Sequence, residues 1–250
     1  MKLAAIFVVW SDCIELLPYA VENIRPVVDD VIIVWSRKSN RGIEMEYNLP
    51  ENCHLVQWEP VQRAPQHNEL AKRNIGLEYA KRMECTHFIM LDADEFYRQD
   101  EFNAAKDQIQ EEVISGSVCR VQAYFKSATL TIGIDHTIVP FIHRITPNLK
   151  YELNFKRYPF AFQNGTAYID PTRRLNITNG VKMMDITMHH YSWVRKDFKL
   201  KMENSSANLR GSRGEIILED LRNAKPGYFC KGYQRELIEC KNLFNLPFYD

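Results

Sequence analysis

One stretch decides the fold: residues 86–96 read Thr86-His87-Phe88-Ile89-Met90-Leu91-Asp92-Ala93-Asp94-Glu95-Phe96. The run from His87 to Leu91 has the length and apolarity of a buried strand. It passes directly into Asp92 and Asp94, two carboxylates one residue apart. Such a pair suits Mg²⁺ or Mn²⁺, because these cations commonly take one or two carboxylates and complete their shell with phosphate oxygens and water. The stretch therefore predicts a metal site at the end of a strand; the alternative is a solvated acidic turn.

The residues before this stretch alternate short apolar runs with helical patterns. Strands are predicted at 3–10, 31–35 and 54–58, and helices at 12–25 and 66–83. This order indicates a parallel α/β sheet with right-handed crossovers. Ligands of such sheets bind at the carboxyl ends of the strands.

Three strand ends should therefore meet in one crevice: Trp10-Ser11, Trp35-Ser36 and Leu91-Asp92. Beyond residue 97 the pattern changes. A helix is predicted at 102–114, strands at 118–125, 137–145 and 185–189, and a mostly helical stretch from 196 to 244.

Composition sets limits on the class of protein. The 250 residues hold 32 basic and 32 acidic side chains, so no overall field favours nucleic acid or a membrane. The six cysteines have no close spacing, which predicts free thiols and a cytoplasmic protein. No run approaches the ~20 apolar residues of a membrane span. The apolar N-terminal run is interpreted as a first strand and not as a signal peptide, since it is only about eight residues long.

A second motif lies on the predicted helix at 66–83: His67-Asn68-Glu69-Leu70-Ala71-Lys72-Arg73-Asn74-Ile75-Gly76-Leu77. Together with residues 86–96, this block resembles family 2 glycosyltransferases of the GT-A fold, whose signature pairs an Arg-Asn-x-Gly helix with a strand ending in Asp-x-Asp. The Asp-Glu-Phe ending resembles a subgroup with an extended motif. The similarity covers roughly residues 3 to 97.

The resemblance implies a Rossmann-like, mostly parallel sheet flanked by helices, with a helical C-terminal region. It implies a catalytic core over 1–195, made of a nucleotide-sugar-binding half (1–97) and an acceptor half (98–195). Residues 196–250 would form a C-terminal helical lid or appendage.

The resemblance also implies roles by position. Asp94 is expected to bind the metal directly, and Asp92 to contact the ribose or the metal through water. Lys72 and Arg73 are expected to face the uridine or the phosphates, and Ser11 and Ser36 to line the base pocket. The family usually has an aspartate after the second strand, where this chain has Ser36.

A further metal ligand of these enzymes is commonly a histidine, which points to His189-His190. Only one of two neighbours on a strand can face the crevice. His189 is preferred, because Ile186 and Met188 alternate with Thr187 and His189, and the polar face is expected to face the site.

An inverting transfer needs a carboxylate that deprotonates the acceptor hydroxyl. The candidates are Glu152, Asp135, Asp170 and Asp185, of which Glu152 is preferred. A retaining reaction needs no such base, and the sequence leaves the stereochemistry open.

The stretch 195–213 carries a local charge of +4 from Arg195, Lys196, Lys199, Lys201, Arg210 and Arg213 against Asp197 and Glu203. Such a stretch can close over a donor diphosphate, with Lys199 as a candidate donor-binding residue, or bind a polyanionic acceptor. The alternative is a solvated helix face.

The sequence thus predicts a glycosyltransferase that uses Mn²⁺ or Mg²⁺ and a nucleotide-sugar donor, by resemblance a UDP-sugar. The expected acceptor is a hydroxyl of a glycan, lipopolysaccharide or lipid-linked sugar. A DNA glycosyltransferase acting on a hydroxymethylated base is the second possibility. A sugar nucleotidyltransferase is less favoured, because no Gly-rich loop follows the first strand, and a non-catalytic module is disfavoured by the intact Asp92 and Asp94.

Overall fold

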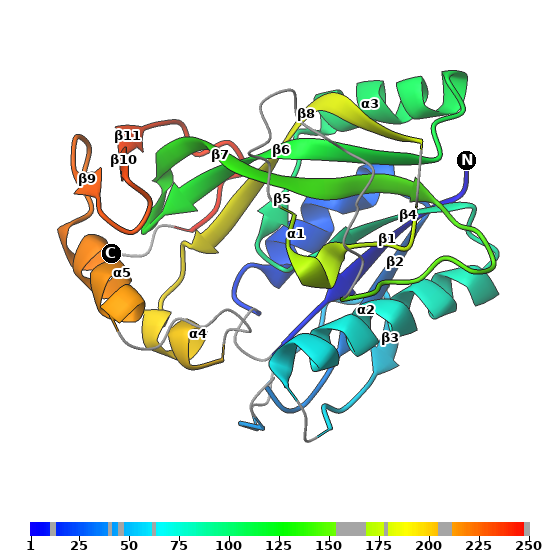
Figure 1. Ribbon diagram of the computed structural model, residues 1–250, viewed down its shortest axis with the longest axis horizontal. Coiled ribbons are helices and arrows are strands. Elements are labelled where there is room, and N and C mark those ends of the chain that lie inside the picture. The colour runs from blue at the N-terminus through cyan, green and yellow to red at the C-terminus, as the bar shows by residue number, and fades with distance from the viewer. Residues whose placement is uncertain are drawn as a thin grey trace.

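The structure is a computed structural model, and it describes residues 1–10, 14–39, 42–44, 48–61, 64–153, 169–177, 180–204 and 212–247. Its first half is the predicted parallel unit (Figure 1). Strands β1 (Leu3–Val8), β2 (Asp30–Trp35), β3 (His54–Gln57) and β4 (His87–Leu91) all run parallel in the order β3-β2-β1-β4. The helices of this unit are α1 (Leu17–Ile24), the short 3-10 turn η2 (Arg25–Val27) and α2 (Pro65–Arg82).

Both faces of this sheet are covered, because every residue of β1 is buried. Leu3, Ala5 and Phe7 pack on one face with α1 and with α3 (Gln99–Glu111). The alternate residues of β1 pack on the other face with Leu77 and Ala80 of α2. A strand buried on both faces reads as a continuous apolar run, which is the pattern seen in the sequence.

Helix α2 lies unusually close to the sheet at Gly76. A Cβ at this position would meet Cγ2 of Ile6 at 2.4 Å. The glycine of the second sequence motif is therefore required for the packing of α2 on β1, which in turn sets the position of the residues one turn before it.

The second half extends the same sheet. Strands β6 (Gly116–Phe125) and β7 (Ser127–Arg144) form an antiparallel hairpin, and β7 pairs antiparallel with β4. Strand β8 (Val181–Trp193) runs parallel to β6, and the two-residue strand β5 (Glu95–Phe96) pairs antiparallel with β8. The predicted α/β class, with a mixed sheet flanked by helices, is confirmed.

The C-terminal region contains the helices α4 (Phe198–Asn204) and α5 (Ser212–Asn223), as expected, but short strands follow them. Strands β9 (Phe229–Cys230) and β10 (Arg235–Glu236) pair with each other, and β11 (Ile238–Glu239) pairs with β7 of the main sheet. The region is thus joined to the sheet by main-chain hydrogen bonds as well as by side-chain packing.

In the described ranges, no helix has the length and apolarity of a transmembrane segment. The described cysteines, Cys53, Cys85, Cys119, Cys230 and Cys240, are free thiols, as the sequence predicts. Cys13 lies outside the described residues.

Candidate active site

The Asp92-Ala93-Asp94 segment connects β4 to β5 at the carboxyl end of the parallel strands. Ala93 is fully buried in the core, so the two aspartates point to the other side, into a cavity of about 480 Å³. The segment is held in place from both ends: the amide of Tyr191 donates to the carbonyl of Asp94 at 2.8 Å, and the amide of Asp92 donates to Glu95 Oε2 at 3.0 Å. Strand β8 and the carboxylate of Glu95 therefore fix the backbone that presents the motif.

Asp92 is bound by two arginines. Arg73 Nη2 donates to Asp92 Oδ1 at 3.0 Å, and Arg173 donates to Asp92 Oδ2. Burial alone would raise the pKa of Asp92, but Arg173 and Arg73 lower it to about 2. Both of its oxygens are thus engaged by guanidinium groups, and Asp92 is an ionised anchor for them.

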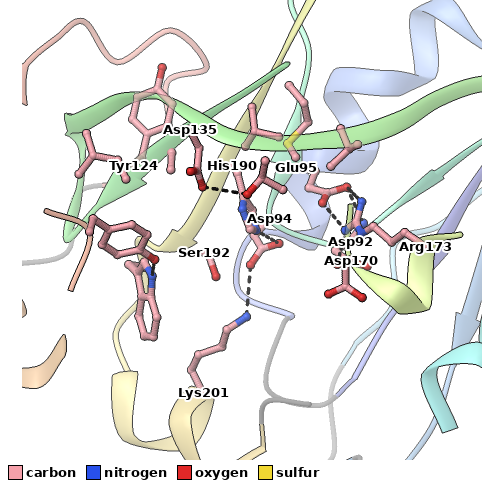
Figure 2. A pocket seen from close by; sticks show the side chains of 18 of the residues that line it. Asp92, Asp94, Glu95, Tyr124, Asp135, Asp170, Arg173, His190, Ser192 and Lys201 are labelled. Carbon is pink, nitrogen blue, oxygen red and sulfur yellow. Dashed lines mark hydrogen bonds and ion pairs between the residues drawn. The ribbon is translucent and has the colours of Figure 1, made fainter. Parts of the chain in front are cut away.

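Arg173 also binds Glu95, whose side chain is almost completely buried. Burial raises the pKa of Glu95 and outweighs the opposing effect of Arg173. Arg173 lies on the 3-10 turn η3 (Pro171–Arg173), where Asp170 caps the turn by accepting a hydrogen bond from the amide of Thr172 at 2.7 Å. Figure 2 shows Asp92, Glu95, Asp170 and Arg173 as one group.

Asp94 has a different set of partners. Arg195 Nη2 donates to its Oδ2 at 2.8 Å, and Lys201 Nζ lies 3.7 Å from the same oxygen. His190 Nε2 lies 3.6 Å from Oδ1 (Figure 2). Burial alone would raise the pKa of Asp94, yet these groups hold it well below 3.8, Lys201 having the largest effect. The side chain is only 3% exposed, so Asp94 is a buried carboxylate and not part of a solvated acidic turn.

Arg73 has hydrogen-bonding capacity that the described residues do not use. Its side chain is 2% exposed, and its Nε and Nη1 have no hydrogen-bond partner among the described residues. The same is true of the buried Trp10 Nε1, which lines the same cavity. Leaving a buried donor unsatisfied costs about 1–3 kcal/mol, so these donors indicate a site that a polar ligand completes.

Residues from both halves of the chain line the cavity. On the side of the parallel strands these are Val8, Trp10, Glu69, Arg73, Asp92, Asp94, Glu95, Asp170 and Arg173. From β6, β7 and β8 they are Val121, Ala123, Tyr124, Ile132, Asp135, His136, Thr137, Val139, Met188, His190, Ser192 and Trp193. From the C-terminal region they are Lys201, Arg213, Ile217, Gly232, Tyr233, Gln234 and Arg235.

No family model matches this sequence, and no curated protein matches it by sequence. By structure, the chain is similar to residues 1–349 of TarS from S. aureus, with 15% identity over 89% of this chain and 71% of that chain, and a TM-score of 0.47. The longer S. aureus TarS structure is matched over 89% of this chain but only 43% of that chain, with 16% identity and a TM-score of 0.42. A mannose-1-phosphate geranyltransferase from Thermus thermophilus is matched over 52% of this chain and 44% of that chain, with 14% identity and a TM-score of 0.32.

Of the two histidines, the structure places His190 and not His189 at the cavity. His189 is 4% exposed and bonds through Nδ1 to the hydroxyl of Tyr124 at 2.8 Å. Burial lowers the pKa of His189 to about 4. The alternation along β8 was assigned to the wrong faces, because the wall of the cavity is partly apolar and Met188 lies on it beside His190.

Several predicted donor-binding residues lie elsewhere. Lys72 is fully buried, donates to the carbonyl of Val9 and lies with Nζ 3.7 Å from the centre of the Trp10 ring, so it supports the end of β1. Ser36 is buried, does not line the cavity and bonds to the carbonyl of Lys38. Ser11 lies outside the described residues.

Two further predicted residues are also outside the cavity. Lys199 is 84% exposed and lies 3.9 Å from Glu203 on α4. Glu152 pairs with Lys150 at 2.7 Å and is not among the residues that line the cavity. The base preferred from the sequence therefore does not line the cavity, whereas the alternatives Asp135 and Asp170 both do.

The structure adds Arg173 and Glu69 to the site, neither of which the sequence pattern singled out as a site residue, and it places Trp10 on the cavity, as expected for the end of the first strand. Glu69 lies 3.8 Å from Arg73 on α2. Arg173 had a local signal, since Asp170-Pro171 is a typical start for a helical turn. Nothing in the sequence, however, shows that this turn packs against Asp92.

In the part of the chain that the structure describes, no group of three or more His, Cys, Asp or Glu side chains is placed to hold a metal ion. The oxygens of Asp92 accept from Arg73 and Arg173, so they do not suit a cation. Asp94 Oδ1 and His190 Nε2 do, because they lie 3.6 Å apart on the same cavity. Two protein ligands fit a Mg²⁺ or Mn²⁺ ion that takes its remaining ligands from phosphate and water.

Proposed function

We propose that this protein is a GT-A-type glycosyltransferase that moves a sugar from a nucleotide donor, a UDP-sugar, to a hydroxyl acceptor. The observation that carries the proposal is the buried Arg73, which is bound to Asp92 of the Asp-x-Asp segment, lines the cavity, and has two nitrogens, Nε and Nη1, without a hydrogen-bond partner among the described residues. Arginine presents a planar fork of donors that matches phosphate and carbonyl oxygens. A nucleotide bound here would satisfy donors that are otherwise buried without a partner.

The charges of the site suit a diphosphate that binds together with a divalent cation. The carboxylates Asp92, Asp94 and Glu95 contact four cationic side chains, Arg73, Arg173, Arg195 and Lys201. Glu69 beside Arg73 brings this cluster close to neutrality, so the charge of a metal ion would help to hold the paired phosphates. Lys201 makes the longest of these four contacts, with its Nζ 3.7 Å from Asp94 Oδ2.

Asp94 and His190 are the residues that would hold a Mn²⁺ or Mg²⁺ ion. When bound, such an ion neutralises the negative charge that develops on the leaving diphosphate. Arg195, 4% exposed, holds the other oxygen of Asp94 and would keep the carboxylate turned so that Oδ1 faces His190.

Asp135 is proposed as the base that removes the proton from the acceptor hydroxyl. It lines the cavity from β7, and its carboxylate lies 2.7 Å from His136 Nδ1 and accepts from the hydroxyl of Thr137 at 3.2 Å. Asp170 also lines the cavity, but one of its oxygens accepts two hydrogen bonds from Thr172. In the proposed step the acceptor oxygen bonds to the anomeric carbon as its proton moves to Asp135, and the diphosphate leaves with the electrons of the broken bond.

A glycan or lipid-linked sugar is the proposed acceptor. The basic stretch, which raised the possibility of DNA as an acceptor, does not form a continuous basic surface in the described residues. Arg195 and Lys201 turn inward to Asp94, and Lys199 lies near Glu203. DNA is therefore not favoured by the positions of these charges.

Incubation of the protein with a panel of UDP-sugars and Mn²⁺, with UDP release as the readout, tests the proposal. We expect UDP to be released from one or a few of these donors by the wild-type protein, and not by an Arg73→Gln variant. Because Arg73 is buried, the variant must first be shown to be folded by circular dichroism. Failure of the wild-type protein to bind or turn over any UDP-sugar would contradict the proposal.

A further inference from the structure

One end of the cavity is walled by the C-terminal region. Arg213 and Ile217 of α5 line it, together with residues 232–235 around the turn between β9 and β10. Figure 1 places α5 and β9–β11 at the opposite end of the molecule from β2 and β3. The wall therefore comes from another region of the fold than Trp10, Arg73 and Arg173, which line the same cavity.

This wall is a built structure, with a core of its own. Ile217, Leu221, Cys230 and Leu237 are all buried against residues of β6, β7 and β8. The pairing of β11 with β7 joins the wall to the main sheet, with Ile238 opposite Thr131. The wall residues are therefore held in place before any ligand binds.

Asp220 fixes the turn that lines the cavity. It is fully buried and accepts hydrogen bonds from the amides of Lys231 at 3.0 Å and Gly232 at 2.7 Å, and from the hydroxyl of Tyr228 at 3.0 Å. A Cβ at Gly232 would lie 3.2 Å from Asp220 Oδ2, so only glycine allows this approach without a shift. The turn is thereby set to place Tyr233, Gln234 and Arg235 on the cavity.

Two aromatic side chains that line the cavity at this wall, Trp193 and Tyr233, are joined by a hydrogen bond. Trp193 Nε1 donates to the hydroxyl oxygen of Tyr233, and the Tyr233 ring packs edge-on against Phe125 with centroids 5.8 Å apart. Because the oxygen of Tyr233 accepts from Trp193, its own proton is free to be donated to a ligand. Burial raises the pKa of Tyr233 to about 12, so the proton is retained at neutral pH.

Two arginines supply positive charge at the same wall. Arg213 and Arg235 both line the cavity, and in the described ranges no carboxylate lies within ion-pair distance of either. One N–H of Arg235 donates to the carbonyl of Ile134, the residue that precedes Asp135 on β7. This hydrogen bond holds the Arg235 guanidinium against β7. Arginines without carboxylate partners, on a preformed wall, suit an anionic group of a ligand.

We propose that this wall is the acceptor subsite, and that it takes a hydroxyl acceptor carrying an anionic group, a phosphate or a carboxylate. Arg213 and Arg235 bind the anion, and Tyr233, whose oxygen accepts from Trp193, donates a hydrogen bond to the polyol or sugar. The reacting hydroxyl then lies on the Asp135 side of the cavity. The inference rests on the proposed function, and it adds the chemical class of the acceptor.

Matched pairs of anionic and neutral ligands test the subsite directly: glycerol 3-phosphate against glycerol, and methyl glucuronide against methyl glucoside. Ligand-observed NMR titration of the full chain would measure their binding with and without UDP and Mn²⁺. We expect at least one anionic ligand to bind about tenfold more tightly than its neutral partner, and the two pairs show whether phosphate or carboxylate is preferred. The double variant Arg213→Gln/Arg235→Gln is expected to lose this preference, whereas Arg222→Gln, an exposed change on the same helix, keeps it.

UDP affinity, measured separately on each variant, distinguishes this inference from the proposed function. Unchanged UDP affinity with loss of anion binding supports the subsite. Three outcomes would overturn the subsite: equal binding of anionic and neutral ligands, binding of neither, or an unchanged preference in the double variant. None of them bears on donor binding, which the UDP affinity tests separately. Tight, salt-steep retention of duplex DNA that disappears in the double variant would also overturn it and make a polyanion the ligand.

Discussion

Asp94 and its neighbours show how three side chains from one stretch, 190–201, serve a carboxylate that is distant from them in the sequence. Oδ2 is held by Arg195 and approached by Lys201, whereas Oδ1 lies near His190. The two oxygens therefore face different chemistry, one fixed by a buried guanidinium and one open to the cavity. This asymmetry is the basis for two predictions about single residues.

Replacement of His190 by alanine should weaken Mn²⁺-dependent UDP binding by about tenfold, since it removes one of two proposed protein ligands. His189→Ala is the matched change at the neighbouring position. It should leave the metal dependence unchanged and lower thermal stability instead, because His189 is buried against Tyr124. Calorimetry with UDP at fixed Mn²⁺ measures the first effect and thermal unfolding the second; equal loss of UDP affinity in both variants would count against His190 as the ligand.

Lys201 and Lys199 form a second matched pair, two residues apart on α4. Lys201 Nζ lies 3.7 Å from Asp94, whereas Lys199 is 84% exposed. We expect Lys201→Ala to raise the dissociation constant for UDP about tenfold, because a partly buried cation is removed from beside the diphosphate, and Lys199→Ala to change it less than about twofold. The opposite ranking would mean that α4 moves when the donor binds.

At the scale of elements, the sequence predicted the parallel half of the sheet because its signals are local. Continuous apolar runs define β1, β2 and β4, and Pro65 marks the start of α2. The same helix shows what the pattern does not reveal. Its buried residues include Asn68, Lys72 and Arg73, and a polar residue that is buried for function looks, in sequence, like a solvated one.

The antiparallel half was harder to predict for a different reason. Strand β7 begins at Ser127 and not near the predicted start at Thr137. The part that the prediction missed is irregular, because Gly133 adopts φ +76° and the pairing with β6 contains register shifts. Such irregularities interrupt the alternation by which strands are recognised. The faces of β8 were assigned incorrectly at His189 and His190 for another reason, because the cavity wall is partly apolar and Met188 lies on it with His190.

The turn between β9 and β10 gives a prediction for a whole element. Asp220→Asn replaces an acceptor of two backbone N–H groups by a side chain that is partly a donor, and should destabilise the protein by about 1–3 kcal/mol. We expect faster hydrogen exchange at the Lys231 and Gly232 amides and an unchanged UDP affinity. The control is Glu219→Gln, on the same helix as Asp220, which alters only the exposed ion pair between Glu219 and Lys231. Protection of both amides in the Asp220 variant would show that the turn is held by other contacts.

At the scale of the whole molecule, the histidines predict how stability depends on pH. His143 is 2% exposed in β7, and burial lowers its pKa to about 3, against an ordinary value of 6.5. The unfolded chain therefore takes up a proton at this position between pH 6.5 and 3 while the folded chain does not, so folding stability falls as the pH falls through that range. Between pH 7 and pH 5 the loss attributable to His143 is about 2 kcal/mol.

Urea denaturation at pH 7, 6 and 5 measures this dependence. A His143→Gln variant should show a shallower loss of stability with falling pH than the wild type, whatever its stability at pH 7. His54→Gln, at a residue 45% exposed, serves as the control and should keep the wild-type slope. Identical slopes for all three proteins would mean that His143 is protonated in the folded state.

The two halves of the chain meet at a single cavity, and this arrangement connects the fold to the proposed activity. The parallel half supplies Arg73, Asp92 and Asp94, and the antiparallel half with the C-terminal region supplies His190 and Lys201. A nucleotide diphosphate between them would contact both halves. The central claim is that this cavity binds such a ligand with a divalent cation.

Isothermal titration calorimetry of the wild-type protein with UDP, in Mn²⁺ and in EDTA, tests that claim most directly. The account predicts that UDP binds in Mn²⁺ at least about tenfold more tightly than in EDTA, since the charge of the ion contributes to holding the paired phosphates beside Asp94. It also predicts that His190→Ala removes most of this difference. Equal UDP affinity in Mn²⁺ and EDTA, or no UDP binding in either, would contradict it.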